Sequence, residues 1–550
     1  MNIGEMQRLL SLKAEREPHH RFGDLFGLLC NTDWLWLAHD YVAQNTGSKT
    51  AGCDGIDMAR FDECLEHNLH SLRESLQSQT FVACPVRRVN IPKPNGRLRP
   101  LGIPSIRDRI VQEAMRMILE PIFEADFCQN SYGFRPNRRT MDAIKHILWS
   151  TTESKKFFWV IEGDISAYFD TICHRKLVKL LRRRIGDDRL LDLIWKFLRA
   201  GVMERKLFKD TKLGTPQGGI ISPLLANVYL HELDTYMECY TGLSLNEKTR
   251  RRRKRLPNYV YIRYADDFVV LCNGTRVHAL AMREELQSFL HTSLCLTLSM
   301  EKTKVTHLND GINFLGFTLR RCRGRTKIGV KTLISAKALK RHLATLKAAT
   351  GSSTFDDSVI SKIQALSRII AGWCRYYQYT SKPGVQFKEL AYKTFWLFAH
   401  WLAGKHRLSM PATLRRFRRN GTLGTEKLSL LKHTSFPALR YLERFRKPNP
   451  YTTQAVVCRE EQLDSNPWLG QEDRPGMADL RLLVMERDGY ICQLCKKPVT
   501  ASTCAVDHIR PVSHFKRPVD ANFLGNLWTL CIACHKAKTE MDRRMESRMR

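Results

Sequence analysis

Hydrophobic and polar positions along the chain change their spacing several times, and each change predicts a different kind of element. Residues 1–75 carry apolar positions at helical spacing, and a loop of glycines and small polar residues interrupts them at 45–55. Residues 89–104 predict two short strands about a Pro-Asn-Gly turn. From about 330 to 405 apolar positions recur every three or four residues, which indicates helices. The chain is therefore expected to mix helices and strands.

Two strongly apolar runs in the middle of the chain enclose a pair of acids. Tyr259–Arg263 and Phe268–Cys272 are rich in residues that favour strands, so they predict a hairpin with Asp266 and Asp267 at its tip. Solvated turn residues are the commoner explanation of an isolated Asp-Asp pair. Adjacent acids between buried strands repel each other unless a cation lies between them, so a third acid nearby would favour a divalent metal.

A third carboxylate follows another apolar run. Residues 157–161 predict a buried strand that leads directly to Asp164, where a carboxylate needs a cationic partner. Asp164 would supply the third metal ligand, and the Ile165 carbonyl a fourth. Phosphoryl transfer to a 3′-hydroxyl uses two such ions, about 3.5–4 Å apart. Phe169 is either a core residue or a flat wall beside this site that collides with a ribose 2′-hydroxyl and selects deoxynucleotides.

Two further stretches offer contacts for phosphates. Lys93, Arg97 and Arg99 lie where they can hold a triphosphate or a template backbone, although a solvated basic hairpin explains them nearly as well. The glycine-rich loop 214–219 opens a helix expected over about 222–233. Glycine lets the backbone approach a ligand closely, and a helix N-terminus favours negative charge. Such loops are common, so this one alone is weak evidence for a phosphate-binding site.

Composition narrows the choice of partner. The chain has 89 Lys and Arg against 55 Asp and Glu, a formal charge of +34, which suits a long polyanion such as nucleic acid. Neither end offers the amphipathic anchor or lipidation signal of a membrane-surface protein, and no apolar run approaches the roughly 18 residues that span a bilayer. The N-terminus lacks a secretory signal, so a cytoplasmic protein is expected. Of the 17 cysteines, all but four near the C-terminus are expected as reduced core residues.

The motifs and their order make a family resemblance specific. They are RPLGIP (99–104), SYGFRP (131–136), GDISAYFD (163–170), GTPQGGIISPLLANVYL (214–230), YADD (264–267), EKT (301–303) and FLGF (314–317). This set resembles the reverse transcriptases of the group II intron-encoded protein family, over nearly the whole chain. The resemblance implies an α+β fold, with a right-hand polymerase of fingers, palm and helical thumb. It also implies two Mg²⁺ ions held by Asp164, Asp266 and Asp267.

The same resemblance implies contacts around these ions. It makes Lys93 and Arg99 candidates for binding the incoming nucleotide, and it places Gln217 and Gly218 near template and nucleotide. Phe169 joins this set from its position five residues after Asp164. Lys302, after a short strand expected at 296–298, is the candidate for contacting pyrophosphate, with Lys304 as the alternative.

Three more regions are expected to meet nucleic acid. The basic run Thr249–Arg255 is either a solvated face or a set of RNA phosphate contacts. Aromatic residues cluster among basic ones in the helical region; most are expected in the core, and the remainder to stack on RNA bases or ribose. This region resembles the family's thumb, domain X, which contributes to maturase binding of the intron. Residues 406–470 suit a loosely folded DNA-binding segment and a linker.

Two Cys-x-x-Cys pairs near the C-terminus predict a metal site. The thiolates of Cys492, Cys495, Cys531 and Cys534 can close a tetrahedral Zn²⁺ site. A zinc ribbon with a purely structural role explains these cysteines but leaves the polar residues around them unexplained.

Those polar residues resemble an H-N-H endonuclease of the ββα-metal fold. By that resemblance His508 is the general base that activates water and Asn526 orients the loop. His535, with help from Asp507, would hold a divalent ion at the scissile phosphate.

The expected domains follow from these assignments. They are an N-terminal RNA-binding extension (1–75), reverse transcriptase fingers and palm (76–325), a thumb or maturase domain X (326–405), a DNA-binding segment and linker (406–474), and an H-N-H endonuclease domain with structural zinc (475–550).

The hypothesis is a multifunctional mobile-intron protein. It binds its own group II intron RNA as a ribonucleoprotein, helps the intron to splice, nicks target DNA, and copies the RNA from the new 3′ end with dNTPs. One rival is an RNA-folding splicing cofactor whose reverse transcriptase fold does not polymerise; another is a reverse transcriptase of a different bacterial element, such as a retron. No membrane partner is expected. A bacterial cytoplasm, with nucleoid association on DNA, is the expected location, while an organellar origin and a homodimer stay open.

Overall fold

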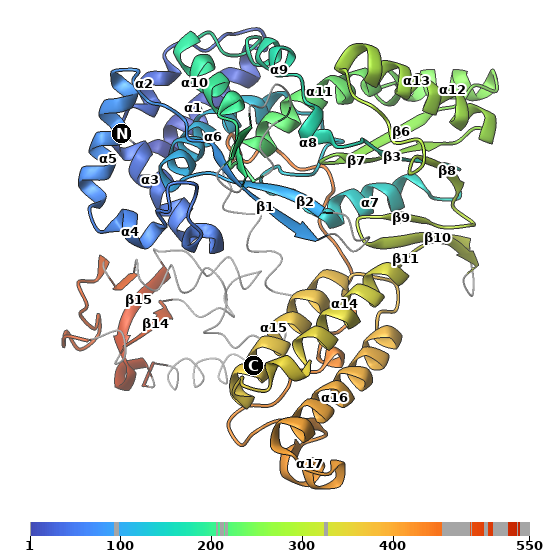
Figure 1. Cartoon of the computed structure of the whole chain (residues 1–550). Coiled ribbons are helices and arrows are strands. Elements are labelled where there is room, and N and C mark those ends of the chain that lie inside the picture. Colours follow the sequence, from blue (N-terminus) through green and yellow to red (C-terminus); the bar gives the residue numbers. More distant parts are fainter. Residues whose placement is uncertain are drawn as a thin grey trace. The chain divides into compact units, whose positions relative to one another are not determined.

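The computed structural model describes residues 2–92, 98–204, 207–209, 214, 218–323, 328–453, 484–485, 487–499, 504–509, 526–535 and 537–538. The chain divides into two units, Met1–Asn449 and Pro450–Arg550, and each is described by itself. Helices and strands are mixed throughout the first unit (Figure 1). Among the helices that the structure describes, none is long and apolar enough to cross a bilayer.

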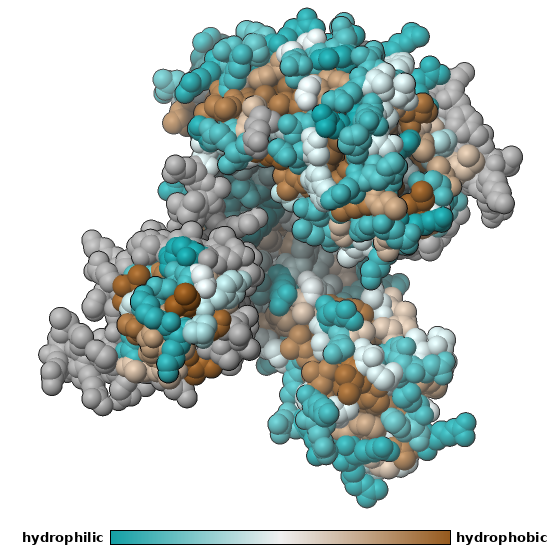
Figure 2. All heavy atoms as spheres, turned by 90° about the vertical axis from the view of Figure 1, so that its left-hand side faces the viewer, coloured by the Kyte–Doolittle hydropathy of each residue, from teal (hydrophilic) through white to brown (hydrophobic). Residues whose placement is uncertain are grey.

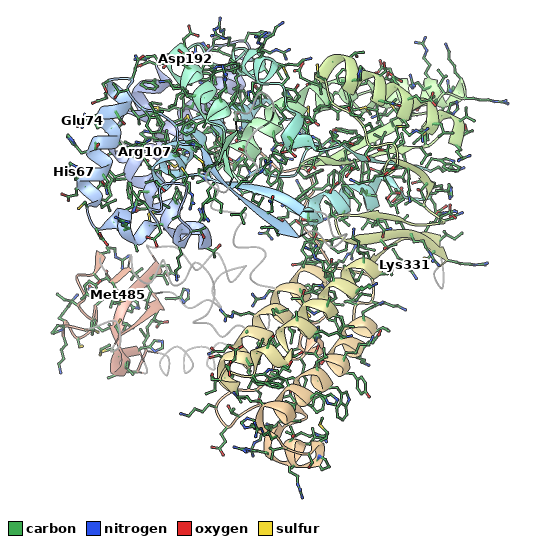
Figure 3. All side chains as sticks on the ribbon, viewed as in Figure 1. His67, Glu74, Arg107, Asp192, Lys331 and Met485 are labelled. Carbon is green, nitrogen blue, oxygen red and sulfur yellow. The ribbon has the colours of Figure 1, made fainter. Side chains whose placement is uncertain are left out.

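The N-terminal helices pack around one long buried helix. They are α1 (Ile3–Arg16), α2 (Leu25–Leu29), α3 (Thr32–Gln44), α4 (Met58–Asp62) and α5 (Leu65–Gln77), and the long helix is α6 (Ile106–Asp126). On α5, Leu69 and Leu72 face the core while His67 and Glu74 point outward (Figure 3). Hydrophilic side chains accordingly cover most of this face of the unit, with hydrophobic ones between them (Figure 2). The predicted helices are confirmed, and so is the break at 45–55, which holds only a short 3₁₀ turn, Thr46–Lys49.

A small sheet follows these helices. It has the order β2-β1-β4-β5, from β1 (Val86–Pro92), β2 (Leu98–Ile103), β4 (Val202–Glu204) and β5 (Leu207–Lys209). The predicted hairpin is confirmed, because β1 and β2 pair antiparallel from Arg87 opposite Ile103 to Pro92 opposite Leu98. Its turn, with Lys93 and Arg97, lies outside the described residues.

The central sheet has the order β6-β7-β3-β8, from β3 (Trp159–Asp164), β6 (Tyr259–Tyr264), β7 (Asp267–Cys272) and β8 (Lys304–His307). Helices α11 (Ser222–Thr241) and α13 (Arg276–Leu294) cover the face that includes Ile161, and α7 (Thr140–Ser150) covers the face that includes Val160. Alternate residues of β3 therefore enter two different hydrophobic clusters. Because both faces are buried, these strands are continuous apolar runs rather than alternating ones.

Shorter helices and one basic helix connect the two sheets. They are α8 (Tyr168–Thr171), α9 (His174–Leu181), α10 (Asp188–Arg199) and α12 (Leu245–Arg253). Residues Thr249–Arg253 of the basic run form the second half of α12, and Lys254 and Arg255 follow its end. The helix is capped by Ser244 and Glu247 and has no buried residue. Helix α11 runs on to Thr241, beyond the end expected near Leu233.

A third sheet joins the central region to the last helices of this unit. Strands β9 (Ile312–Phe314), β10 (Phe317–Arg323) and β11 (Ile328–Ile334) form an antiparallel sheet. Helices α14 (Ala336–Ala349), α15 (Val359–Tyr377), α16 (Gly384–His406) and α17 (Met410–Phe417) follow, then a hairpin of β12 (Arg418–Arg419) and β13 (Thr422–Leu423). The expectation that residues 330–334 are helical is wrong, because they belong to strand β11.

The strand expected at 296–298 is also wrong. Only Leu298 pairs there, in an isolated bridge with Ile165. Leu296 and Leu298 are buried by packing into the hydrophobic cluster, so their apolar spacing reflects burial rather than a ladder of hydrogen bonds.

The segment from the β12–β13 hairpin to Asn449 runs back over earlier helices. Tyr441 donates a hydrogen bond to Asp142 of α7 at 2.7 Å, and the Phe445 ring stacks on His146 at 4.4 Å. Asn449 donates to both Ser11 and Glu15 of α1. We call residues 441–449 the return segment; it ties the end of the first unit to its beginning.

The second unit contains a short hairpin and a small core. Strands β14 (Cys504–His508) and β15 (Leu527–Cys531) pair antiparallel, and Met485, Cys492, Val499, Cys504 and Leu530 form the core. A helical turn follows β15 at residues 532–535.

The cysteine expectation is only partly right. No disulfide links the described cysteines. Of those outside the two Cys-x-x-Cys pairs, Cys30, Cys128, Cys272, Cys374 and Cys504 are buried, while Cys53, Cys64, Cys239 and Cys295 are exposed. They lie in loops or near the ends of helices, where a small thiol is tolerated at the surface.

Candidate functional site

Three aspartates meet at one corner of the central sheet. Asp164 ends β3, and in the β3–β7 ladder its Cα partner is Asp267, the first residue of β7. Asp266 precedes it in the β6–β7 turn, so the predicted hairpin with two acids at its tip is confirmed. Directly opposed carboxylates repel each other across a sheet. Desolvation by neighbouring atoms, then the like charges of Asp266 and Asp164, raises the pKa of Asp267 to about 6, although its side chain reaches the surface.

These acids fit a cation-binding role. Their carboxylate oxygens are more widely spaced than the ligand atoms of the C-terminal cysteines, which all lie within 4.8 Å of one another in the described part of the chain. The chain itself places a cation beside them, since Lys302 Nζ donates to Asp164 Oδ2 at 2.8 Å. A corner of like charges that already attracts an ammonium group suits divalent ions.

The turn that carries Lys302 is fixed to the end of β3. The Ser299 amide donates to the Asp164 carbonyl at 2.8 Å, and the Thr303 amide donates to the Ser299 carbonyl at 2.7 Å. Lys304, in contrast, lies in β8 opposite Glu162. Of the two lysines considered for pyrophosphate, the structure therefore brings Lys302 to the acidic corner.

A buried charge network lies under the turn. Arg263 and Asp234 are fully buried and form a two-pronged ion pair, at 2.7 Å from Nε and 2.5 Å from the terminal nitrogen. Arg263 also donates to the Asn227 side chain and to the Ala265 carbonyl. Burial opposes the charge, but Asp234 outweighs it and raises the pKa of Arg263. The sequence analysis missed this network. Its signal was Arg263 inside an otherwise apolar strand and Asp234 on a largely apolar helix.

The loop of the SYGFRP motif (131–136) packs against the same turn and is hydrogen-bonded to the residues that hold it. The Tyr132 amide donates to the Arg263 carbonyl at 2.9 Å, and Asn227 donates to the Gly133 carbonyl at 2.9 Å. A Cβ atom on Gly133 would lie 2.2 Å from the Ala265 nitrogen. Glycine is required here because the two backbones are in direct contact.

Two glycines of the glycine-rich loop lie against predicted nucleotide-binding elements. A Cβ on Gly214 would lie 2.8 Å from the Phe169 carbonyl, and one on Gly218 would lie 2.3 Å from the Gly102 carbonyl of β2. Both glycines have positive φ. The Phe169 ring is half-buried, edge-on to Tyr168 at 5.3 Å. Ile165 is buried beside Asp164.

Several predicted contacts cannot be placed. Lys93 and Gln217 lie outside the described residues, and Arg99 is described only as part of the backbone of β2.

Four cysteines of the second unit form a metal-ligand cluster. The sulfur atoms of Cys492, Cys495, Cys531 and Cys534 all lie within 4.8 Å of one another, as predicted from the two Cys-x-x-Cys pairs. Burial opposes ionisation of Cys492, but backbone hydrogen bonds from Cys495 and Cys531 lower its pKa to about 6. A set of four thiols with an acidic member fits a tetrahedral zinc ion. Cys504 lies opposite Cys531 in the ladder, but its sulfur contacts Met485 instead.

The polar residues of the same unit gather on its hairpin. Asp507 and His508 end β14, and the Ile509 amide donates to the carbonyl of Asn526, which is buried just before β15. His535 Nε2 lies 3.9 Å from Asp507 Oδ1. The structure thus brings His535 to Asp507, as expected for a shared ion, and places His508 and Asn526 at the same end of the hairpin.

The two sites define a class of protein. The first is the acidic strand-and-hairpin corner of a metal-dependent nucleotidyltransferase, and the second combines a zinc-type cysteine cluster with nuclease-like His, Asp and Asn residues. Family models match three parts of the chain. They are a reverse transcriptase (RNA-dependent DNA polymerase) at residues 91–319, the maturase-specific domain of group II introns at 339–420, and an HNH endonuclease at 492–541.

Curated relatives agree with these matches. Protein YkfC of Escherichia coli K12 is 44% identical over 343 residues, which cover 59% of this chain and 90% of that protein. The group II intron-encoded protein LtrA of Lactococcus lactis subsp. cremoris is 35% identical over 364 residues, covering 58% of this chain and 60% of LtrA. The chain therefore belongs to the family of group II intron reverse transcriptases that carry a maturase domain and an HNH endonuclease domain.

A yeast relative and a solved structure are more distant. The putative COX1/OXI3 intron 1 protein of Saccharomyces cerevisiae is 29% identical over 474 residues, 72% of this chain and 55% of that protein. A solved structure of telomerase from Candida albicans has 12% identity and a TM-score of 0.34, over 66% of this chain and 67% of that one.

Proposed function

We propose that this protein copies RNA into DNA at the corner formed by Asp164, Asp266 and Asp267. The observation that carries the proposal is the register that sets Asp164 opposite Asp267, beside the turn that holds Asp266. Two Mg²⁺ ions held by these carboxylates and the Ile165 carbonyl would supply activation of the primer 3′-hydroxyl and stabilisation of the leaving group. The Arg263–Asp234 pair fixes the turn, so that the carboxylates keep their positions.

Neighbouring residues would bind the incoming dNTP. Lys302 lies where its ammonium group can contact the pyrophosphate part, and the Phe169 ring would exclude a ribose 2′-hydroxyl. Arg99 of β2 and the backbone at Gly218 would contact the triphosphate or the template, together with Lys93 and Gln217. In this arrangement residues 76–325 act as fingers and palm, and residues 326–405 as a thumb that holds the template and primer.

The maturase domain and the HNH domain extend this activity to a mobile intron. We propose that the protein binds its own group II intron RNA, assists its splicing, and then acts with that RNA on target DNA. This rests on the maturase-specific match and on the similarity to LtrA.

In the nuclease, His508 would take a proton from the attacking water while Asn526 holds the loop in place. Asp507 and His535 would hold a divalent ion that stabilises the scissile phosphate, and zinc at the four cysteines would maintain the fold. The nick would supply the 3′ end from which the polymerase starts.

Primer extension on poly(rA)/oligo(dT) tests the proposal directly. We expect cDNA from the native protein and from His508→Ala, and none from Asp266→Ala. A nicking assay on DNA should give the opposite pattern for the two variants.

The rival function is an RNA-folding splicing cofactor that does not polymerise. It predicts no extension by any of the three proteins, including a preparation bound to its own intron RNA. Splicing assays do not discriminate, because both functions predict that Asp164→Ala still supports splicing.

A further inference from the structure

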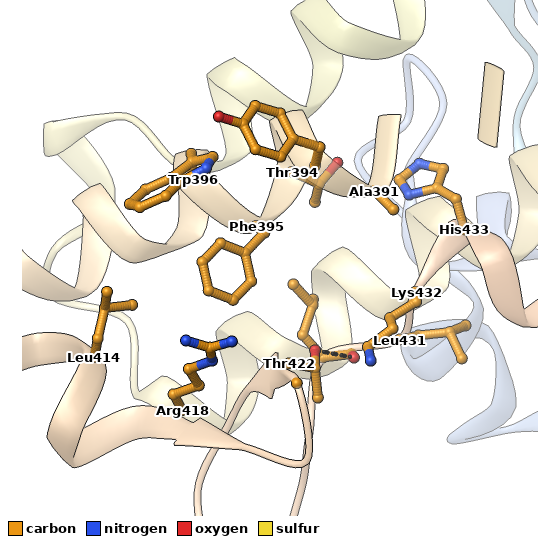
Figure 4. A pocket seen from close by; sticks show the side chains of 13 residues that line it. Ala391, Thr394, Phe395, Trp396, Leu414, Arg418, Thr422, Leu431, Lys432 and His433 are labelled. Carbon is orange, nitrogen blue, oxygen red and sulfur yellow. Dashed lines mark hydrogen bonds between the residues drawn. The ribbon is translucent and has the colours of Figure 1, made fainter. Parts of the chain in front are cut away.

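A cleft of about 350 Å³ lies in and beside the maturase-specific region, and its lining includes no residue of either candidate site. Helices α16 and α17, the β12–β13 hairpin and the segment 430–433 form its walls (Figure 4). This volume falls in the range of pockets that hold small ligands, about 300–1,000 Å³.

One wall of the cleft is aromatic. Tyr392, Phe395 and Trp396 project from one stretch of α16, and Phe395 and Tyr392 both lie edge-on to Trp396, at 5.4 and 6.3 Å. Tyr392 is 68% exposed, and among the residues that the structure describes its ring contact is with Trp396 of the same helix. Exposed rings beside a cleft offer flat faces for a base to stack on.

Two unpaired cations lie at the same cleft. Arg418 of β12 is exposed, and its guanidinium group points toward the Phe395 ring (Figure 4). Lys432 lines the cleft from the segment after the hairpin. Neither forms an ion pair with any residue that the structure describes, whereas the neighbouring Arg419 pairs with Glu426. The cleft is therefore suited to an anionic ligand.

The inner wall carries hydrogen-bonding atoms without partners. Thr394 Oγ1 and His433 Nδ1 are buried and have no hydrogen-bond partner among the described residues. Burial lowers the pKa of His433 to about 3, and its other nitrogen contacts His342 at 2.9 Å. A buried polar group without a hydrogen-bond partner destabilises the fold, so a polar ligand that reaches these atoms gains affinity.

We propose that this cleft binds a single unstacked nucleotide of an RNA strand. Its base stacks on the aromatic wall with its polar edge toward Thr394 and His433, and its phosphate lies between Arg418 and Lys432. Aromatic faces, cations without a described carboxylate partner and unpaired hydrogen-bonding atoms match a nucleotide better than an apolar peptide, which leaves the charges and polar atoms unsatisfied. The Lys432 ammonium group does donate to the Asn420 carbonyl at 3.4 Å, a neutral acceptor that leaves its charge uncompensated. The inference rests on the proposed binding of intron RNA by the maturase domain and names where one nucleotide of it docks.

Photocrosslinking of the full-length protein tests this assignment. The probe is a short single-stranded oligoribonucleotide containing 5-iodouridine, whose excited base crosslinks to aromatic side chains stacked on it. Mapping by mass spectrometry should place a crosslink at Tyr392, Phe395 or Trp396. The matching deoxyribonucleotide probe is run in parallel and should crosslink there less.

Matched variants separate the cleft from the general basic surface. Arg418→Ala should reduce the crosslink yield at 391–396 about fivefold or more, whereas Arg419→Ala, on the adjacent residue of β12, should not. Tyr392→Ala should reduce the yield by about five- to 150-fold, as expected from the loss of about 1–3 kcal/mol of base stacking, and Tyr392→Phe should restore it. A melting temperature and a far-UV circular dichroism spectrum at the native level show that each variant is folded.

Two results overturn the assignment. One is an active polymerase whose crosslinks map outside the cleft or respond equally to Arg418→Ala and Arg419→Ala. The other is equal crosslinking of the RNA and DNA probes. A native protein that crosslinks in the cleft but fails to extend a primer would instead refute the polymerase and leave the nucleotide site intact.

Discussion

Lys302 donates a hydrogen bond from Nζ to Oδ2 of Asp164 at 2.8 Å, so an ammonium group occupies the acidic corner of the central sheet. The turn 299–303 fixes this lysine by two backbone bonds that involve Ser299. The ammonium group partly neutralises Asp164 and so reduces the repulsion at this corner. In the proposed polymerase, Mg²⁺ at Asp164 would release the lysine to contact an anionic group of the substrate.

Lys302→Ala separates these two roles. We expect the polymerisation rate to fall about 10²-fold, because one preorganised donor to the leaving group is lost. The Mg²⁺ concentration for half-maximal activity should fall as well, because the ammonium group no longer competes for Asp164. Single-turnover primer extension over a Mg²⁺ titration measures both quantities. Lys304→Ala, on β8, is the control, and equal effects of the two variants would contradict the assignment.

Gly133→Ala should disturb the catalytic turn without touching a carboxylate. The added Cβ would lie 2.2 Å from the Ala265 nitrogen, so the loop and the turn must separate. A misplacement of about 1 Å can cost about 10²-fold in rate, and we expect a loss of that order in primer extension. Gly329→Ala is the matched control, since a Cβ there meets open space. Unchanged activity in Gly133→Ala would show that the turn tolerates the shift.

His146 should make the protein sensitive to acid. Burial, aided by Arg446 and Lys155, lowers its pKa to about 3, from an ordinary value near 6.5. The unfolded chain therefore binds a proton that the folded chain refuses between these values, and the free energy of unfolding decreases as pH falls from about 6.5 toward 3. One such site contributes a slope of up to about 1.4 kcal/mol per pH unit.

The test compares melting temperatures of His146→Gln and the native protein across this range. The loss of stability on acidification should be smaller in the variant, while His67→Gln on the exposed face of α5 should follow the native curve. Other buried groups titrate in both proteins, so the difference between the curves is the informative quantity. Parallel curves for His146→Gln and the native protein would contradict the prediction.

Cys495→Ser should abolish zinc binding. The predicted site needs four thiolates, so metal analysis of the purified protein should fall from about one zinc per chain to near zero. DNA nicking should be lost with the metal, while primer extension persists. Cys504→Ala, which removes a thiol that contacts Met485, should retain zinc. Zinc retained in Cys495→Ser, or lost equally in both variants, would refute the cysteine assignment.

The sequence predicted the acidic corner well because the physics is local there. A strand buried on both faces must be a continuous apolar run, so an aspartate at its end is conspicuous, and two such runs about Asp266 and Asp267 indicate a hairpin. The zinc-type cluster could also be predicted from sequence, since the spacing of the two Cys-x-x-Cys pairs identifies its four ligands.

Other features depended on distant residues. The Arg263–Asp234 pair forms only when β6 packs on α11, so neither residue could be matched to the other in advance. Choosing between Lys302 and Lys304 required the register of β8, which turns Lys304 toward Glu162. Leu296 and Leu298 imitated a strand because they are buried, although only one bridge forms there.

The return segment links the end of the first unit back to its earlier helices. Through Tyr441, Phe445 and Asn449 it connects the chain that leaves the last maturase helix to α7 and α1. If helices α14–α17, nearly all of which the maturase-specific match covers, move away from the central sheet, the return segment must extend or lose these contacts. The contacts of nine residues therefore set how far that part of the protein can open around a nucleic acid before it pulls on the N-terminal helix.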